Sequence, residues 1–264
     1  MTTESFFVAG VDIGAATAKS VILNENEIIA SYVMPTGHSV EKAAEAVMQK
    51  SLEKKNLSMT RIRHVISTGY GRRAVPFADD AVTEISCHAK GVHALIAGAR
   101  TVIDVGGQDS KVIEIDDNGS IGNFVMNDKC AAGTGRFLEV MAKVLNTDIE
   151  DIGTISLQGH EPCQISNTCT VFAESEMVTL RAEGKSRENL FSGIHAAMAH
   201  RIAIMGHSVG FRKQIVFTGG VAKNVGMKKA LEDKIGMKII VPEEPQIVGA
   251  LGAAILARNR IKIQ

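Results

Sequence analysis

The sequence predicts an α/β protein made of two related lobes that face each other across a cleft. Two hydrophobic strands end in the same pattern of Asp, an apolar residue and Gly, at Asp12-Ile13-Gly14 and at Asp104-Val105-Gly106. A turn and a second strand follow each copy, and amphipathic helices occupy much of the chain between them. An internal duplication explains both copies. The alternative is coincidence, because Asp-x-Gly is a common turn sequence.

The first lobe is assigned to residues 1–100. Its opening strand is apolar along most of its length, as expected for a buried strand, and the turn Asn24-Glu25-Asn26 connects two further strands. The helix that follows carries Val40, Ala44 and Val47 on one face at helical spacing. The expected elements are strands over residues 6–13, 19–23, 28–33 and 63–67 and a helix over residues 40–54.

The second lobe is assigned to residues 101–264. Asp117-Asn118-Gly119 has the composition of a tight hairpin turn after the second strand of this lobe. The last helix, near residues 249–258, is expected to pack back on the first lobe. The expected elements are strands over residues 101–105, 111–115 and 215–217 and helices over residues 131–145, 170–182, 187–209 and 249–258.

Composition excludes several classes of function. The 264 residues carry 29 Lys and Arg against 29 Asp and Glu, so a zero formal net charge offers no general attraction for nucleic acid or an anionic membrane. Aromatic residues make up 4% and Trp is absent, which argues against stacking platforms for bases. No apolar run reaches a transmembrane length, and the N-terminal segment lacks a basic stretch and a cleavage site. We therefore expect a cytoplasmic protein whose four cysteines are free or bound to a metal.

The first strand end has the residues expected of a phosphate site. A Gly-rich hairpin lets backbone N–H groups approach phosphate oxygens. Asp12 at the strand end can hold the water shell of Mg²⁺, and Lys19 on the return strand is placed to reach the phosphates. In the alternative, the aspartates of the two copies merely cap tight turns. The residues assigned to the nucleotide in this hairpin are Gly14, Ala15, Ala16 and Thr17.

Two further Gly-rich strand ends complete the predicted nucleotide site. Asp104 repeats the position of Asp12, and Gln108 in the loop after it could orient an attacking water. These two residues join Asp12 and Lys19 as the predicted catalytic residues. Neither a Gly-x-x-x-x-Gly-Lys-Ser/Thr stretch nor a Gly-x-Gly-x-x-Gly fingerprint occurs, so a P-loop or Rossmann protein is not expected. The residues assigned to the nucleotide in these loops are Gly106, Gly107, Gly219, Gly220 and Asn224.

Two of the four cysteines stand in the setting of cluster ligands. Cys130 and Cys169 each directly precede a predicted helix, whose N-terminal partial positive charge favours an anionic cluster. Small and polar residues flank both, unlike thiols in an apolar core. An iron–sulfur cube needs four thiolates, so two ligands per chain suggest one cluster shared across the two-fold axis of a dimer. Buried or incidental cysteines are the alternative, and Cys87 and Cys163 lack the helix-start setting.

The nucleotide-site residues together resemble the superfamily of sugar kinases, actin and the heat-shock chaperone ATPases. The resemblance covers Asp12-Ile13-Gly14 with Lys19, residues 104–107 and residues 218–220. It implies two ribonuclease-H-like lobes with ATP and Mg²⁺ between them. The sequence departs from the pattern at Ala15 and Ala16, where hydroxyl residues are usual. The N–H groups of that turn must then hold the phosphates with less help from side chains.

Longer segments closely resemble the activators of 2-hydroxyacyl-CoA dehydratases and benzoyl-CoA reductases, a family that includes activators of double-cubane-cluster proteins. The resemblance implies a homodimer that holds one [4Fe–4S] cluster through Cys130 and Cys169 of each subunit. It also implies that ATP hydrolysis drives one electron into a partner iron–sulfur enzyme, after reduced ferredoxin or flavodoxin has loaded the cluster. Gly133, Thr134 and Gly135 are assigned to the nucleotide pocket. The matching segments are residues 68–72, 84–91, 104–113, 127–142 and 166–176.

Two other functions remain open on sequence grounds. A phosphotransferase acting on a small molecule would need a catalytic carboxylate base, and the chain has little room for a sugar-binding insertion. A nucleotide-binding regulator without catalysis is disfavoured by the presence of the predicted catalytic residues.

Overall fold

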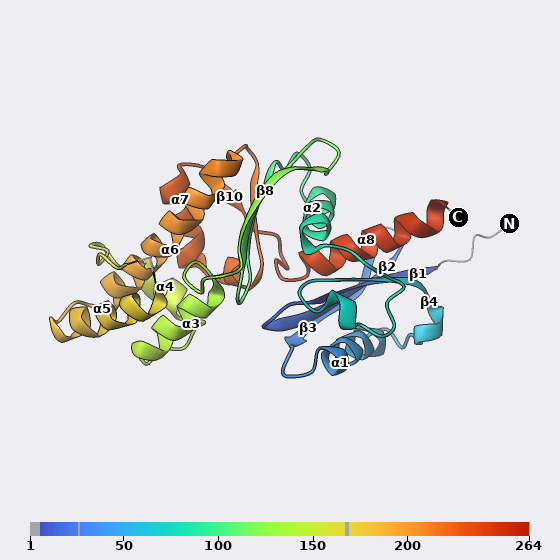
Figure 1. Ribbon diagram of the computed structural model, residues 1–264, viewed down its shortest axis with the longest axis horizontal. Helices are drawn as coiled ribbons and strands as arrows, with labels where there is room; N and C mark the ends of the chain where they lie inside the picture. Colours follow the sequence, from blue (N-terminus) through green and yellow to red (C-terminus); the bar gives the residue numbers. More distant parts are fainter. Residues whose placement is uncertain (1–5, 26, 167–168, 264) are drawn as a thin grey trace. The chain divides into compact units, whose positions relative to one another are not determined.

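A computed structural model describes residues 6–25, 27–166 and 169–263 of the chain. The chain divides into two compact units. Unit 1 consists of Met1–Gly98, Ile115–Ile121 and Gln246–Gln264, and unit 2 consists of Ala99–Glu114 and Gly122–Pro245. Two five-stranded sheets with helices packed against them give the α/β class that the sequence predicts (Figure 1).

The sheet of unit 1 has the strand order β3-β2-β1-β4-β5. Its central strand β1 pairs antiparallel with β2 and parallel with β4, and every residue of β1 after Phe7 is buried. A strand covered on both faces shows a nearly continuous apolar run in place of alternation. The strands are β1 (Phe7–Ile13), β2 (Thr17–Asn24), β3 (Glu27–Pro35), β4 (Ile62–Thr68) and β5 (Asp80–Ala81).

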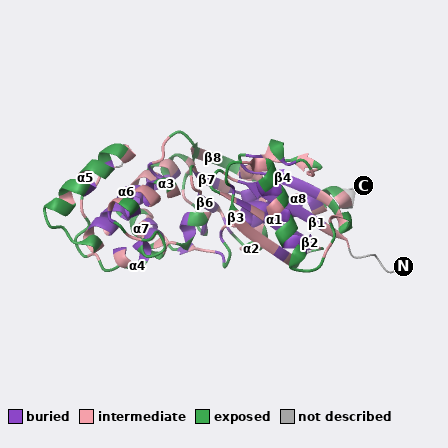
Figure 2. Cartoon of the chain, turned by 90° about the horizontal axis from the view of Figure 1, so that it is seen from below, coloured by how far each residue is buried: buried purple, intermediate pink, exposed green. Residues whose placement is uncertain are grey.

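Helices cover both faces of this sheet (Figure 1). Helix α1 (Val40–Glu53) packs its apolar side on one face, while α8 (Val248–Ile263) packs on the other beside α2 (Glu84–Leu95). Glycine permits the close approach of α8, because a Cβ at Gly10 would overlap the carbonyl oxygen of Ala250. Figure 2 shows the buried strands between their helices. Short 3₁₀ helices cover Met59–Arg61 and Arg72–Ala74.

The second sheet repeats the first, strand for strand. Its order, β10-β9-β6-β7-β8, places β6 to β10 in the positions of β1 to β5. As in the first sheet, the central strand β6 pairs antiparallel with the next strand and parallel with β9. The shared order and pairing directions confirm the predicted duplication. The strands are β6 (Thr101–Val105), β7 (Ser110–Ile115), β8 (Ile121–Asn127), β9 (Ile215–Thr218) and β10 (Ile239–Ile240).

The helices of unit 2 enclose one apolar core. Its largest fully buried side chains include Phe137, Phe191 and Phe217, which come from two helices and from β9. The helices are α3 (Gly135–Val144), α4 (Ile152–Ser156), α5 (Thr170–Ala182), α6 (Arg187–Val209) and α7 (Val225–Ile235), with a 3₁₀ helix over Gly220–Lys223.

Helix boundaries agree with the sequence in part. Helices α5 and α6 begin and end at the predicted residues. The predicted helix start at Ala131 is wrong, because α3 begins at Gly135. Gly133 has a φ of 95° and Thr134 has the extended conformation of an N-cap, so the chain turns before the helix. The sequence analysis did not predict β8, α2, α4 or α7, and Asn26 of the predicted first turn lies outside the described residues.

Across the described ranges, no helix is both long enough and apolar enough to span a bilayer.

Candidate functional site

The loop between β1 and β2 presents backbone donors. Its own carbonyl oxygens are bonded within the protein: Thr36 donates its N–H to Ala16 O and its Oγ1 hydroxyl to Gly14 O, at 3.0 and 2.8 Å. The N–H of Gly14 donates to Thr17 O, which closes the turn. The N–H groups of Ala15 and Ala16 donate to no acceptor among the described residues, and both residues are exposed. A turn with fixed carbonyls and free N–H groups is a site for an anion such as phosphate.

Asp12 and Lys19 face each other across the β1–β2 ladder. They are register partners, and Lys19 Nζ lies 3.3 Å from Asp12 Oδ2. Two glycines border the carboxylate: a Cβ at Gly69, whose φ is 84°, would overlap Asp12 Oδ1, and one at Gly249 would lie 2.9 Å from Oδ2. The lysine side chain retains 14% of its exposure. A Cβ at Gly14 would lie 3.2 Å from Lys19 Nζ, so the end of this side chain lies beside the β1–β2 loop.

The loop between β6 and β7 repeats this arrangement. Gly106 donates its N–H to Asp109 O at 3.0 Å, and the carbonyl oxygens of Gly106 and Gly107 accept the N–H groups of Gly135 and Arg136 at 2.8 Å each. Again, the N–H groups of two loop residues, Gly107 and Gln108, donate to no acceptor in the described structure. Gln108 is exposed at the tip. The first turn of α3 is thus bonded directly to the second phosphate loop.

Asp104 is the partner of a lysine that the sequence analysis missed. Lys111 is its register partner on β7, with Nζ 3.2 Å from Asp104 Oδ2 and 2.9 Å from Asp109 Oδ1. The Thr218 hydroxyl donates to Asp104 Oδ1 at 2.9 Å. A signal was present in the sequence, because Lys111 follows Asp104 at the same spacing as Lys19 follows Asp12.

The third loop follows β9. Gly219 has a φ of 87°, and a Cβ there would overlap Val105 O, so only glycine suits this approach to β6. Asn224 caps α7 by accepting the N–H of Met227, and its Nδ2 donates to Nε2 of the buried His195 at 3.1 Å. The assigned Asn224 amide is therefore already bonded within unit 2.

The cysteine-bearing segments differ from each other. Cys169 is the N-cap of α5, in extended conformation, and its side chain makes no capping hydrogen bond to the helix. Cys130 precedes α3 by several residues, and Asn127 Nδ2 donates to its carbonyl oxygen at 2.9 Å. Both thiols are half-buried. Between Cys130 and the helix, Thr134 is fully buried and its hydroxyl donates to Ala131 O at 2.7 Å.

The other two cysteines are poorer ligands. Burial raises the pKa of Cys87 to about 12, although the neighbouring Thr68 side chain has a smaller, opposite effect. Burial also raises the pKa of Cys163, against a smaller opposite effect of Lys185. Because metals bind the thiolate, both shifts disfavour ligation. In the part of the chain described, no three His, Cys, Asp or Glu side chains gather at a spacing suited to a metal ion.

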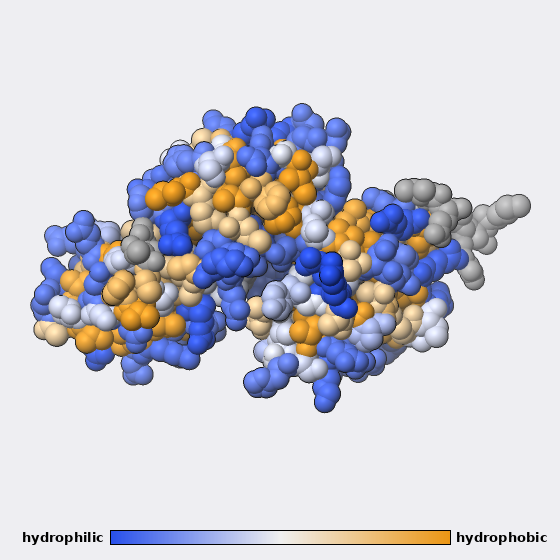
Figure 3. Space-filling view, viewed as in Figure 1, coloured by the Kyte–Doolittle hydropathy of each residue, from blue (hydrophilic) through white to orange (hydrophobic). Residues whose placement is uncertain are grey.

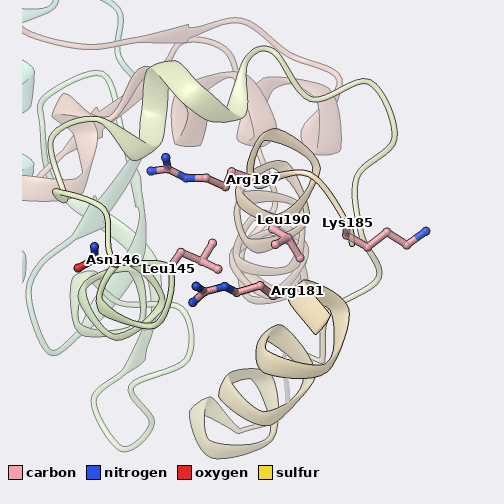
Figure 4. Close-up of a pocket in the computed structure, with 6 residues that line it drawn as sticks. All are labelled: Leu145, Asn146, Arg181, Lys185, Arg187 and Leu190. Carbon is pink, nitrogen blue, oxygen red and sulfur yellow. The ribbon is translucent and has the colours of Figure 1, made fainter. Parts of the chain in front are cut away.

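Unit 2 has two cavities, and none of the predicted nucleotide or cluster residues lines either of them. The first, about 260 Å³, is lined by Arg181 and Arg187 among others (Figure 4). Arg181 donates to Val144 O at the end of α3, and Arg187 donates to Thr147 Oγ1 in the connection that follows. The second, about 330 Å³, includes residues 126–129, next to Cys130. On the surface, Figure 3 shows apolar side chains over α3 and α5. Exposed apolar residues of α5 are Val171, Phe172 and Val178.

Two repeated hairpins with Asp–Lys pairs and unbonded loop N–H groups, followed by a Gly-rich third strand end, define a nucleotide-binding protein with the fold of actin and the sugar kinases. A ROK family glucokinase from Streptomyces griseus shares this fold, with a TM-score of 0.58 at 14% identity over 96% of this chain and 99% of that one. The chain belongs to the BadF/BadG/BcrA/BcrD ATPase family, whose sequence profile matches residues 9–257.

Its relatives in this family include activator proteins. The 2-hydroxyisocaproyl-CoA dehydratase activator of Clostridioides difficile is 44% identical over 257 residues, which are 97% of this chain and 96% of the relative. An activator structure from that organism with bound ADPNP has a TM-score of 0.93 at 43% identity, covering 98% and 96% of the two chains. Component A of the Acidaminococcus fermentans (R)-2-hydroxyglutaryl-CoA dehydratase has a TM-score of 0.95 at 38% identity, covering 98% and 100%. Membership of this ATPase family supports ATP binding and hydrolysis by the chain.

Proposed function

We propose that this protein is an ATP-dependent one-electron donor that activates a partner iron–sulfur enzyme. The partner would be of the 2-hydroxyacyl-CoA dehydratase or double-cubane type, and reduced ferredoxin or flavodoxin would supply the electron. One observation carries the proposal: the first two N–H groups of α3 are bonded to the loop Gly106–Gly107, and Cys130 lies just before that helix. A change at the phosphates thereby reaches the segment of a cluster ligand through two hydrogen bonds.

The nucleotide is assigned to the loops with unbonded donors. In unit 1, the N–H groups of Ala15 and Ala16 and the ammonium of Lys19 would bind phosphate oxygens. In unit 2, the N–H groups of Gly107 and Gln108 would do the same. Asp12 and Asp104 offer hard carboxylate oxygens at strand ends, which suit the water shell of Mg²⁺. Gln108 is exposed at the loop tip and would orient the attacking water. Gly133 and Gly219 remain assigned to the nucleotide pocket, and both have a positive φ, a conformation that favours glycine.

The thiols of Cys130 and Cys169 fit a [4Fe–4S] cluster in their chemistry. Both are half-buried, and the side chain of Cys169 is not used to cap its helix. One chain offers two such thiols, whereas a cube needs four. A homodimer with one cluster supplies the missing pair. The bound cluster would store one electron at low potential.

Iron content tests the proposal. Protein purified without oxygen should be brown and contain about four irons per two chains. Cys130→Ser and Cys169→Ser should each lose the cluster, while Cys163→Ser, as a matched control, should retain it. Loss of iron from Cys163→Ser as complete as that from Cys169→Ser would contradict the two-ligand assignment. Reduction of a candidate partner enzyme that requires both ATP and the cluster would then establish electron transfer.

A further inference from the structure

We propose that Lys111 is a positioning residue of the ATPase site, which holds the second phosphate loop in shape without binding phosphate itself. This inference rests on the proposed nucleotide site. It gives Lys19 and Lys111, which occupy equivalent positions in the repeat, different roles. Lys19 would bind the phosphates, and Lys111 would fix the loop that carries Gln108.

The two lysines differ in their surroundings although they occupy equivalent positions. Lys19 pairs with one carboxylate, that of Asp12, and its side chain is 14% exposed. Lys111 is 2% exposed and lies between two carboxylates, Asp104 Oδ2 at 3.2 Å and Asp109 Oδ1 at 2.9 Å. A buried ammonium already bonded to two carboxylates is poorly placed to leave them for a ligand.

Lys111 joins both ends of the loop. Asp104 lies on β6 just before the loop, and Asp109 is its last residue. Gly106 makes the bridge possible, because a Cβ at that position would lie 2.7 Å from Asp109 Oδ1 and block the carboxylate from folding over the loop. The Asp109 carbonyl also accepts the N–H of Gly106 at 3.0 Å. The loop is therefore fixed on one side by Lys111.

The other side of the same loop is fixed by α3, through the N–H groups of Gly135 and Arg136. Together these anchors leave the N–H groups of Gly107 and Gln108 without an acceptor in the described structure. Preorganised donors stabilise charge that develops during reaction, because they need no reorganisation at that moment. Loosening the loop should therefore slow turnover more than it weakens ground-state binding.

A paired comparison of Lys111→Met with Lys19→Met tests this division. Calorimetry with MgADP measures affinity, and phosphate release at saturating MgATP measures kcat. Lys19→Met should weaken nucleotide binding at least about tenfold, since it removes a phosphate contact. Lys111→Met should lower kcat at least about tenfold while nucleotide affinity stays within about threefold. A loss of affinity in Lys111→Met equal to that in Lys19→Met would make Lys111 a phosphate ligand and overturn the proposal.

Two more variants separate positioning from folding. Lys111→Met leaves two carboxylates without their cation and is expected to destabilise the fold. The double variant Lys111→Met/Asp109→Asn removes one of those charges, so its thermal midpoint should recover in part while kcat stays low. Recovery of kcat together with stability would assign Lys111 a structural role only. Asp109→Asn alone keeps the Lys111–Asp104 pair and should lower kcat at least about threefold with nucleotide affinity unchanged; an unaltered kcat would contradict the bridge.

These outcomes are independent of the electron-transfer proposal. A protein without iron would contradict the cluster assignment and leave the lysine comparison intact. Unchanged nucleotide affinity in Lys19→Met would contradict the proposed phosphate site itself.

Discussion

The two aspartates of the repeat are the residues on which the proposed hydrolysis depends most. Each is buried beside a lysine at 3.2 to 3.3 Å, and each is the penultimate residue of a central strand. A carboxylate in this position offers one oxygen to the lysine and leaves the other for a cation's water shell. In Asp104 the second oxygen also accepts the Thr218 hydroxyl, which fixes the carboxylate plane.

Replacing Asp12 or Asp104 by Asn should reduce ATP hydrolysis at least about tenfold, or about 1.4 kcal/mol of barrier. A neutral amide neither pairs with the lysine nor holds the water shell of a divalent cation. Phosphate release at saturating MgATP measures the effect. Asp116→Asn is the matched control, because that carboxylate accepts N–H groups of Asn118 and Ser120 in the turn after β7. Normal hydrolysis by Asp12→Asn would place the phosphate site elsewhere.

The protonation of His195 should make the stability of the protein depend on pH. His195 is 1% exposed, and burial lowers its pKa from 6.5 to about 4. Its Nε2 accepts the Asn224 amide, so the folded protein holds a neutral ring. Between pH 6.5 and about 4 the unfolded chain therefore binds a proton that the folded chain does not, and the free energy of unfolding must fall as the pH falls through that window.

Thermal unfolding between pH 7.5 and 5 should show this contribution. Wild-type protein should lose stability toward pH 5 more steeply than His195→Gln, since glutamine cannot take up the proton. The comparison is between slopes, so the destabilisation of the variant at neutral pH does not affect it. Parallel slopes would show that folding does not lower the pKa of His195.

At the scale of elements, the contact between α3 and the second phosphate loop is the feature of most consequence. Gly135 begins the helix, and a Cβ there would lie 3.0 Å from Gly106 O and 3.3 Å from Gly107 Cα. Gly133, just before it, has a positive φ and packs over Arg201. Gly135 must be glycine because the backbone of the loop approaches it closely, and Gly133 must be glycine because of its positive φ.

Gly133→Val and Gly135→Val should damage ATP turnover and cluster retention together. A β-branched side chain at Gly135 would push the loop and the helix start apart, and one at Gly133 would be strained by the positive φ and would displace Arg201. ATPase rate and iron content measure the two functions, and Lys143→Ala, at an exposed position of the same helix, is the control. Loss of one function with the other intact would separate the loop from the cluster segment.

Nucleotide state should also change the environment of the cluster. Chelators should remove iron at different rates from the apo, ADP and ATP-analogue forms, and the electron-resonance spectrum of the reduced cluster should shift. By reciprocity, any preference of ATP for the reduced form must favour reduction to the same extent. Rates and spectra indifferent to nucleotide, with ATPase activity intact, would show that the two hydrogen bonds carry no coupling.

At the scale of the whole molecule, each chain offers only two of the four thiolates that the proposed cluster needs, so binding of the cluster and formation of the dimer should depend on each other. A group bound only by the dimer stabilises the dimer. Removal of iron by a chelator should therefore raise the dissociation constant of the dimer at least about tenfold, measured by sedimentation under anaerobic conditions. Cys130→Ser should behave like the stripped wild-type protein. An unchanged dissociation constant after complete iron removal would place the cluster away from the subunit contact.

The sequence predicted most of the fold because the repeat lies in strand ends, where Asp and Gly have position-specific roles. The start of α3 was predicted too early, since Ala131 and Ala132 favour helix whereas the turn depends on the φ of Gly133. Lys111 was missed because its role depends on the register that pairs it with Asp104 across β6 and β7. The sequence indicates this pairing only when the spacing from Asp104 to Lys111 is compared with that from Asp12 to Lys19. The hydrogen bond between Asn224 and His195 depends on the packing of α6 against α7. No local sequence pattern indicates this long-range contact.

The division of unit 1 into three segments has a consequence for synthesis on the ribosome. Strand β1 and helix α2 are made early. Helix α8, which covers Val8 and Ile66 on the sheet face opposite α1, begins at Val248, about 150 residues after α2 ends. At translation speeds of about 5–20 residues per second, that delay amounts to roughly 8–30 seconds. For this time the nascent chain presents one uncovered apolar sheet face, while all of unit 2 is being made. Chaperones that bind exposed apolar strands should therefore engage the chain between the emergence of β4 and that of α8.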